Sequence, residues 1–438
     1  MTATADVLKT NGRSDKLFSD FPVAIVCGGG IRTPFAKAPG KLANYGVLDL
    51  GQHVLIQLIE KMGLDSQEID EVILGSVLFN PLDSNFSRHL VFLSGLPRTA
   101  YAATVSNNCI SGLVAIDELA KDIAIGRADI GISGGVESMS NVPLPARPGA
   151  QAFWRNLATA KGLGSRIGAL GKFRPSYLLP AFPQPVEPFT GKTMGQHCEE
   201  MNREFDVARE KQDVIALTSH QNAARARADG ILEEEITPIG GMTRDTGIRE
   251  DTNIEALGRL PTTFDKSRHG TLTAGNSSFP TDGASVICLM SAETAKRQGR
   301  DVLAYIKGCE FAAIDPDDGL LMAPALTVPR LLHRHGLTAN DIDLFEIHEA
   351  FAAQVVANIH VWEHGWDKYP EIQPIGEVAY EKINVNGGSL AIGHPFAATG
   401  ARLVYALAKE LNRRQLKRGV VSVCAAGAEG CAILLETP

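Results

Sequence analysis

The chain has 438 residues, of which 44% are hydrophobic and 21% charged, a composition that is ordinary for a globular protein and excludes fibrous and disordered classes. Its formal net charge of −8 argues against a protein that binds nucleic acid. The seven cysteines lack the C-x-x-C spacing of metal ligands, so we expect reduced thiols and no metal site.

The first residues and the hydropathy pattern bear on the compartment. No apolar run is long enough to cross a membrane. The first twenty residues are polar and include Asp6, Asp15 and Asp20, which fits neither a secretory signal nor an acid-poor transit peptide. We therefore expect a cytoplasmic protein in which residues 1–20 form a flexible tail.

Short apolar runs alternate with longer amphipathic segments through the first third of the chain. The expected strands cover 23–27, 71–77, 102–105 and 128–137, and the expected helices cover 47–62, 85–94 and 113–125. This alternation is typical of an α/β fold with a mainly parallel sheet.

The pattern changes at residues 141–282, where prolines and glycines interrupt a few helices, one of them at 208–228. We interpret this region as an insertion domain. Its stretch 147–174 contains six basic residues and no acidic one, interleaved with apolar side chains such as Trp154. Such a stretch could rest on an anionic membrane or dock a partner subunit, line the entrance for a phosphate-bearing substrate, or form a solvated hairpin.

A repeat links the two ends of the chain. Residues 64–70 are echoed by 337–343, and each copy precedes an apolar strand. The turn at Cys109, with the helix and strand after it, is echoed by the turn at His394, a helix over 399–412 and a strand over 420–424. We expect two related α/β halves packed about a pseudo-twofold axis. The N-terminal half comprises 21–140 and 283–295, and the C-terminal half comprises 296–438.

Cys109 falls where an expected strand turns into a helix, a place where the helix N-terminus stabilises a thiolate. Alternatively, it is a buried small hydrophobe. The pseudo-twofold axis would bring His394, in the glycine-rich loop 386–395, close to Cys109. Its imidazole would then take the thiol proton, leaving a thiolate and an imidazolium. A histidine in such a loop could also serve only as a cap.

Two further strand ends carry reactive groups. His348 ends the expected strand 342–347 and could donate a hydrogen bond to an oxyanion, and Glu349 could orient a histidine or a water. Cys424 closes a buried strand and could exchange a proton with a carbon atom. Each could equally be a strand-end polar residue or a buried thiol.

These two cysteines and two histidines on four loops, together with the tracts Thr273–Ser278, Asp282–Ala284 and Met194-Gly195, resemble the thiolase family. The resemblance covers about residues 23–436. It implies the thiolase-like fold, in which two related α/β halves form a layered sandwich with an insertion domain. It also implies coenzyme A as a substrate and no permanently bound cofactor.

The resemblance assigns a role to each residue. Cys109 would attack the 3-keto carbon of a 3-oxoacyl-CoA, and Cys424 would protonate the departing acetyl-CoA carbanion. CoA, deprotonated with help from His394, would then attack the acyl-enzyme. His348 and His394 would stabilise the enolate oxygen. Backbone N–H groups of Cys109 and of the Cys424 loop would stabilise the tetrahedral intermediate. The expected backbone support is Gly427 and Gly430, and the expected substrate contacts are Met194, Asn276, Ser277, Arg225 and Lys266.

Two departures from the family pattern bear on the substrate. The tract His348–Phe351 has histidine where many thiolases have asparagine, which resembles the thiolase subunits of fatty-acid oxidation complexes and implies degradation of medium or long acyl chains by β-oxidation. Ala428 and Glu429 stand where glycine and glutamine are common, and they could narrow the acetyl pocket or raise the pKa of Cys424.

Several alternatives remain at this stage. They are a biosynthetic acetoacetyl-CoA thiolase, a decarboxylating ketoacyl synthase, against which Cys424 argues, and a lipid-binding or scaffold subunit of a β-oxidation complex. The resemblance further implies a homodimer or homotetramer, and it leaves open a complex with a hydratase/dehydrogenase subunit.

Overall fold

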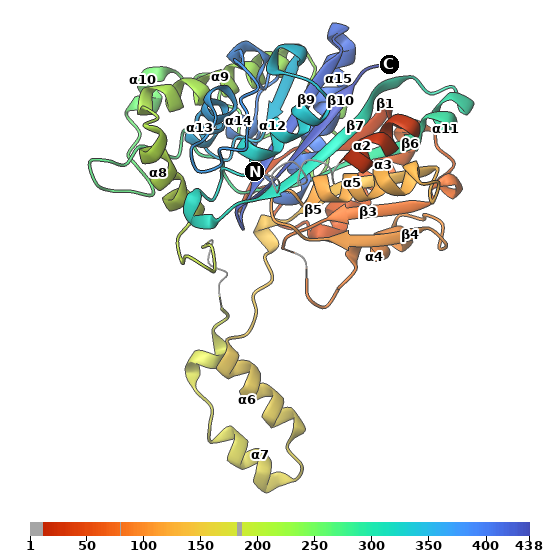
Figure 1. Cartoon of the computed structure of the whole chain (residues 1–438). Coiled ribbons are helices and arrows are strands. Elements are labelled where there is room, and N and C mark those ends of the chain that lie inside the picture. Colours follow the sequence, from red (N-terminus) through yellow and green to blue (C-terminus); the bar gives the residue numbers. More distant parts are fainter. Residues whose placement is uncertain (1–11, 79, 182–185) are drawn as a thin grey trace, which may run out of the picture.

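The molecule is built around one large mixed sheet with helices on its faces (Figure 1). The computed structural model describes residues 12–78, 80–181 and 186–438. The strands are β1 Val23–Arg32, β2 Ala36–Lys37, β3 Glu71–Gly75, β4 Tyr101–Val105, β5 Ile130–Glu137, β6 Thr281–Ser291, β7 Val302–Ala313, β8 Leu344–Ile347, β9 Arg418–Ala425 and β10 Glu429–Glu436. The helices are α2 Gly12–Asp20, α3 Val47–Met62, α4 Phe86–Leu93, α5 Ser111–Ala124, α6 Pro148–Thr159, α7 Leu163–Leu170, α8 Met194–Phe205, α9 Arg209–Ala228, α10 Ile254–Gly258, α11 Ala292–Arg297, α12 Pro324–Arg334, α13 Ala352–His364, α14 Ser389–Ile392 and α15 Phe396–Arg414.

The strand order shows the internal repeat directly. The order is β4-β3-β5-β6-β1-β7-β10-β9-β8, with β2 paired to β6. From the central antiparallel pair of β1 and β7 outward, the sequence β6, β5, β3 on one side matches β10, β9, β8 on the other. The short 3-10 turns Ser66–Glu68 and Ala339–Asp341 precede β3 and β8 in the same way. The predicted pair of related α/β halves is therefore confirmed.

The prediction of a mainly parallel sheet is wrong. The pairs β3–β4, β3–β5 and β8–β9 are parallel, and the other pairs in the described ranges are antiparallel. A parallel pair needs a crossover, usually a helix, whereas β9 and β10 are joined by the three residues 426–428, which permit only a hairpin. The alternation of strands and helices holds only for the first part of each half.

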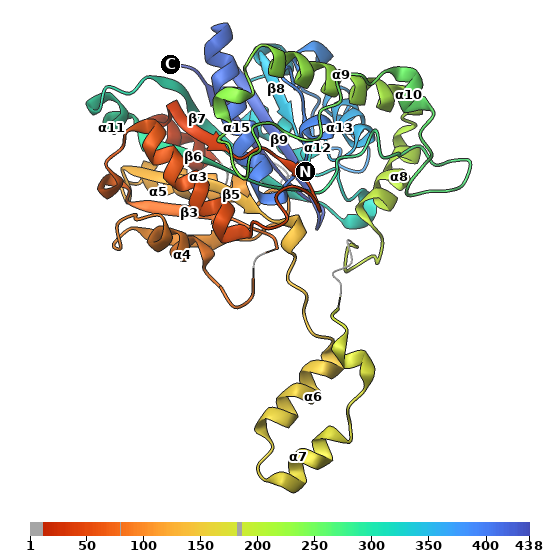
Figure 2. The same cartoon turned by 180° about the vertical axis from the view of Figure 1, so that it is seen from behind.

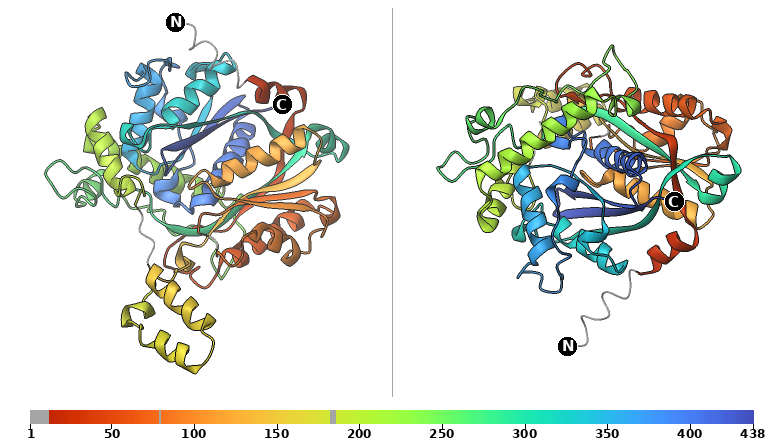
Figure 3. Two further views of the ribbon diagram at one scale, coloured as in Figure 1. Left: turned by 60° about the horizontal axis from the view of Figure 1, so that its bottom comes forward. Right: turned by 90° about the horizontal axis from the view of Figure 1, so that it is seen from above.

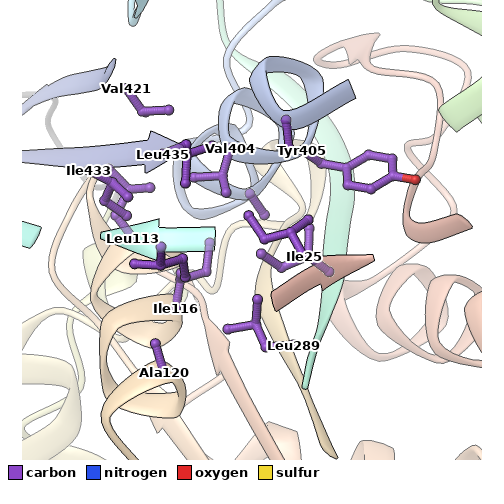
Figure 4. Packing of buried hydrophobic residues seen from close by; sticks show 14 of the residues in the cluster. Ile25, Leu113, Ile116, Ala120, Leu289, Val404, Tyr405, Val421, Ile433 and Leu435 are labelled. Carbon is purple, nitrogen blue, oxygen red and sulfur yellow. The ribbon is translucent and has the colours of Figure 1, made fainter. Parts of the chain in front are cut away.

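The inner core brings α5 and α15 together between the two halves of the sheet (Figure 3). Along β1, Val23 and Ile25 face these helices, while Ala24 and Val26 face the core beneath α3. Figure 4 shows this inner core, with Ile25, Leu113, Ile116, Ala120, Leu289, Val404, Tyr405, Val421, Ile433 and Leu435 labelled.

The starts of α5 and α15 touch. A Cβ atom on Gly112 would lie 2.3 Å from the carbonyl oxygen of Ala397, so only glycine allows this approach. The turns that precede the two helices therefore meet at one place.

The N-terminal segment is not the flexible tail that we expected from 1–20, at least from residue 12 onward. There α2 packs on the sheet, and Phe18 is fully buried in the inner core. Asp15 accepts hydrogen bonds from Arg334, which also binds Glu310. Residues 1–11 lie outside the described residues.

The insertion between β5 and β6 has two parts. Helices α6 and α7 form a hairpin that stands away from the body (Figures 1 and 2). Helices α8, α9 and α10 instead lie along the C-terminal half, where α8 and α9 pack near α13. Within the described ranges, no helix combines the length and the hydropathy needed to span a bilayer.

Candidate active site

Cys109 lies in the tight turn between β4 and α5. Asn108 adopts a left-handed conformation with φ of 47°, and its Nδ2 donates a hydrogen bond to the Ala426 carbonyl at 3.0 Å. The Ser111 hydroxyl accepts from the Asn107 N–H at 2.8 Å and donates to the Asn108 carbonyl at 2.6 Å. These bonds fix the turn and tie it to the loop after Cys424.

His394 lies in the equivalent turn before α15 and reaches Cys109 from the other half. Its Nε2 is 3.2 Å from Cys109 Sγ, and its Nδ1 is 2.7 Å from Thr399 Oγ1. Gly393, with φ of 110°, makes the sharp bend just before it. The structure thus brings the predicted nucleophile and the predicted base together.

Burial sets the protonation of this pair. It raises the pKa of Cys109 to about 12, with a contribution from the Glu137 charge, although a hydrogen bond from the Ala426 backbone opposes the rise. Burial and the Arg402 charge lower the pKa of His394 to about 3. The resting pair is therefore a neutral thiol and a neutral imidazole. Burial of both groups thus disfavours the thiolate and imidazolium that we expected at this helix N-terminus.

His348 lies beside His394, with ring centroids 4.0 Å apart. Its Nδ1 is 2.8 Å from Ser389 Oγ. Its Nε2 is buried and has no hydrogen-bond partner among the described residues. Burial lowers the pKa of His348 well below its usual value, and a positive charge on His394 or Arg402 lowers it further. A neutral ring whose Nε2 makes no hydrogen bond to the described residues is suited to bind a substrate oxygen.

Cys424 is the second-last residue of β9, next to the same site, and is 1% exposed. Burial raises its pKa, and any negative charge on nearby Cys109 would raise it further. Ala428 is buried with φ of 56°, a left-handed conformation that usually falls to glycine.

The two glycines expected to support the site behave differently. Gly427, with φ of 80°, donates its N–H to Glu187 Oε2 at 3.0 Å, so this N–H is already engaged. Gly430 pairs with Cys424 across the hairpin, and a Cβ there would lie 3.1 Å from Ala323. Gly430 therefore lets β10 pack closely on the start of α12.

Two of the five expected substrate contacts lie near these groups. Met194 starts α8 and packs against the apolar cluster that contains Cys424 and Phe351. Ser277 pairs with Phe351 in an isolated bridge, and its buried Oγ has no partner in the described part of the chain.

The other three are engaged elsewhere. Asn276 is fully buried and binds Thr273 N, Asp213 and the Thr271 carbonyl. The exposed Arg225 and Lys266 bind the carbonyls of Val385 and Thr262. None of these three makes a described hydrogen bond to the two cysteines or two histidines. Asn276 is thus a loop-building residue, and the two cations face solvent.

The sequence did not identify several residues around the site. Glu137 is fully buried at the end of β5 and accepts hydrogen bonds from Val77, Leu78 and Ala397 N–H groups at 3.1, 2.8 and 3.3 Å. It joins the loop after β3 to the start of α15. In the sequence, Glu137 stands out only as the single acidic residue at the end of a strand whose other residues are apolar or small.

Glu349 orients neither histidine through a direct bond. Its carboxylate accepts from Ser219 Oγ, Asn384 Nδ2 and Leu390 N at 2.7, 2.6 and 3.1 Å. It therefore fixes the start of α14, which carries Ser389. No group of three or more His, Cys, Asp or Glu side chains able to hold a metal occurs among the residues that the structure describes.

Comparison with known proteins agrees with this geometry. Residues 23–293 match the model for the thiolase N-terminal domain, and residues 300–437 match the model for the thiolase C-terminal domain. The chain is 37% identical over 426 residues to the 3-ketoacyl-CoA thiolase of Pseudoalteromonas translucida, covering 95% of this chain and 97% of that protein. It is 38% identical over 423 residues to the 3-ketoacyl-CoA thiolase of Aeromonas salmonicida, covering 94% and 96%. The crystal structure of the Bacillus anthracis acetyl-CoA acetyltransferase superposes with a TM-score of 0.79 at 30% identity, covering 95% of this chain and 99% of that one. The chain belongs to the thiolase family.

Proposed function

We propose that this protein is a degradative 3-ketoacyl-CoA thiolase, an acyltransferase that converts 3-oxoacyl-CoA and CoA into acetyl-CoA and a shortened acyl-CoA. The observation that carries the proposal is the 3.2 Å contact between Cys109 Sγ and His394 Nε2, made across the joint of the two halves. The curated relatives named 3-ketoacyl-CoA thiolase match nearly the whole chain and support the same activity.

The first half-reaction cleaves the substrate. The Cys109 thiol passes its proton to His394 Nε2 as sulfur attacks the 3-keto carbon. The bond between C2 and C3 then breaks, leaving an acyl group on Cys109 and the enolate of acetyl-CoA. Cys424 donates its proton to C2, which releases acetyl-CoA. The proton held on His394 returns the Cys424 thiolate to a thiol.

The second half-reaction transfers the acyl group. Neutral His394 accepts the proton of the CoA thiol as that sulfur attacks the acyl-enzyme. The Cys109 thiolate leaves and recovers the proton from His394. Each residue thus ends in its starting state, and the raised pKa of Cys424 suits a group that must hold its proton until the carbanion forms.

Oxyanions form in both halves of the reaction. The unpaired, buried His348 Nε2 supports a role as donor to the enolate oxygen, together with His394. The Cys109 N–H and the Ala426 backbone, which approaches the Cys109 thiol, are candidates to stabilise the tetrahedral intermediate. Gly427 would serve only after releasing Glu187.

The alternative is an acetoacetyl-CoA thiolase, which the similarity to the Bacillus anthracis acetyl-CoA acetyltransferase keeps open. The His348 form of the motif favours longer acyl chains instead.

The test is CoA-dependent loss of 3-oxoacyl-CoA substrates with four, ten and sixteen carbons. We expect thiolysis by the wild type, strongest on the longer chains, and its loss in Cys109→Ala and Cys424→Ala. Activity confined to four carbons would favour the acetoacetyl-CoA alternative. No thiolysis at any length would overturn the proposal and leave a lipid-binding or scaffold role.

We further propose that the α6–α7 hairpin contacts an anionic membrane surface. Leu163, Ile167 and Leu170 lie along one face of α7 and are 77%, 60% and 53% exposed, and Trp154 on α6 is 45% exposed. The six basic residues and no acidic one over 147–174 complement anionic lipid.

Reversing three charges in the hairpin, with Arg155→Glu, Lys161→Glu and Arg166→Glu together, should reduce co-sedimentation with phosphatidylglycerol vesicles and leave thiolysis of short substrates intact. The matched control reverses exposed Lys41, Lys296 and Arg297 elsewhere. Unchanged vesicle binding in the hairpin variant would contradict the proposal.

The remaining proposals concern assembly and compartment. The family resemblance favours a homodimer or homotetramer, and β4 at the edge of the sheet leaves backbone groups for pairing with a second copy. A hydratase/dehydrogenase subunit of a β-oxidation complex is the proposed further partner. All seven cysteines are free, which supports a reducing compartment such as the cytoplasm.

A further inference from the structure

Two neutral histidines stand side by side in the site, and each touches one hydroxyl. The rings of His348 and His394 lie 4.0 Å apart at an angle of 38°. His348 Nδ1 is 2.8 Å from Ser389 Oγ, and His394 Nδ1 is 2.7 Å from Thr399 Oγ1. A neutral imidazole has one N–H and one lone pair. The hydroxyl at Nδ1 therefore influences whether Nε2 carries the hydrogen or the lone pair.

The proposed reaction requires opposite protonation states at Nε2 of the two resting rings. His394 Nε2 must accept the Cys109 proton, so the resting His394 must carry its hydrogen on Nδ1. His348 Nε2 must donate to an oxyanion, so the resting His348 must carry its hydrogen on Nε2. His348 and His394 lie side by side in the site and therefore need opposite tautomers.

Thr399 is placed to accept from His394. Its Oγ1 lies 3.4 Å from the Pro395 carbonyl, to which the hydroxyl can donate its proton. The oxygen is then free to accept from His394 Nδ1–H. This arrangement leaves the Nε2 lone pair 3.2 Å from Cys109 Sγ.

Ser389 is placed to donate to His348. The contact with His348 Nδ1 is the only hydrogen bond of the Ser389 hydroxyl within the described ranges, so no second acceptor competes for its proton. Its place is fixed by Glu349, which binds the neighbouring Leu390 N–H at 3.1 Å. A hydroxyl that donates to Nδ1 leaves the hydrogen on Nε2, the atom that is buried without a partner there.

We propose that Thr399 and Ser389 are positioning residues that hold His394 and His348 in opposite tautomers, so that one ring is a base and the other an oxyanion donor. The inference rests on the proposed function, because the two opposite tasks come from the thiolysis mechanism. The burial of both rings, which lowers the pKa of each, supports it by keeping them neutral.

The two hydroxyls can be separated by two readouts. We compare Thr399→Val and Ser389→Ala for kcat of thiolysis and for the rate at which iodoacetamide alkylates Cys109. Thr399→Val should lower both on the order of ten- to a hundredfold, because the base is lost, and Thr399→Ser should restore them. Ser389→Ala should lower kcat by a similar factor, with little change in KM, while Cys109 alkylation stays within about twofold.

Matched controls remove a buried hydroxyl elsewhere. Thr327→Val and Ser133→Ala alter fully buried hydroxyls whose Oγ atoms have no partner in the part of the chain that the structure describes. Both should leave kcat and alkylation unchanged. An equal loss of alkylation in Ser389→Ala and Thr399→Val, or no loss of kcat in either, would overturn the inference.

The tautomers of His348 and His394 can also be observed directly, without substituting Ser389 or Thr399. Long-range ¹H–¹⁵N correlation spectra of histidine-labelled wild type should show His394 protonated at Nδ1 and His348 protonated at Nε2, with signals assigned from His348→Asn and His394→Asn. The same tautomer at both rings would overturn the inference even if thiolysis is strong. Absence of wild-type thiolysis, in contrast, would refute the proposed function and leave this tautomer test standing.

Discussion

The protonation state of Cys109 gives the sharpest quantitative prediction. With the pKa of Cys109 at about 12, only ~10⁻⁴ of the thiol is ionised at pH 8, whereas roughly a quarter of a free cysteine with a pKa near 8.5 would be. The pKa of His394 at about 3 likewise leaves no imidazolium to stabilise a thiolate. We therefore expect Cys109 and His394 to stay neutral across the whole physiological pH range, with the proton moving only during attack.

The assay is the ultraviolet difference spectrum between the wild type and Cys109→Ser, because a thiolate absorbs in the far ultraviolet and a thiol does not. From pH 5 to pH 9 we expect no thiolate signal attributable to Cys109. A signal worth one thiolate per chain, constant down to about pH 5, would show a preformed thiolate–imidazolium pair and refute the reasoning from burial. The variant His394→Asn serves as a reference, because it cannot form such a pair.

Three further changes test other parts of the account. Cys424→Ala should lower thiolysis by a factor of roughly 10² to 10⁴ while iodoacetamide still alkylates Cys109, and loss of alkylation would contradict separate roles for the two thiols. Burial raises the pKa of Glu137 from 4.5 to about 7, so its protonation contributes stability that is present below pH 4.5 and is lost as the pH rises through 7. Glu137→Gln should remove about 3 kcal/mol of this pH dependence in urea unfolding, and an unchanged slope would refute the assignment. Phe18→Ala should lower the free energy of unfolding by about 3 to 5 kcal/mol without changing kcat, whereas a negligible loss would mean that α2 is not docked.

The parts of the fold that repeat locally could be predicted from the sequence. The match of 64–70 with 337–343 placed two equivalent strands, and the equivalent turns before α5 and α15 implied that Cys109 and His394 would meet. The prediction succeeded because two copies of a duplicated unit pack about a pseudo-twofold axis. Equivalent turns then meet, although they lie far apart in the chain. The mixed direction of the sheet was missed, because the 426–428 turn between β9 and β10 was not recognised as a hairpin.

The remaining features depend on contacts between residues far apart in the chain. The docking of α2 depends on Arg334, which is 319 residues from Asp15. The engagement of Asn276, Arg225 and Lys266 by nearby backbone and side-chain groups is likewise invisible in a motif. The strong rise in the Cys109 pKa comes from desolvation by the assembled halves, which a helix N-terminus in the sequence does not reveal.

The central claim is that Cys109 forms an acyl-enzyme, and trapping that species tests it most directly. The wild type would be mixed briefly with 3-oxodecanoyl-CoA in the absence of CoA, quenched in acid, digested and analysed by mass spectrometry. The account predicts an octanoyl group on the peptide that contains Cys109, which disappears when CoA is added and never forms in Cys109→Ala. An acyl group on Cys424 instead, or release of acetyl-CoA without any acylated cysteine, would contradict the account.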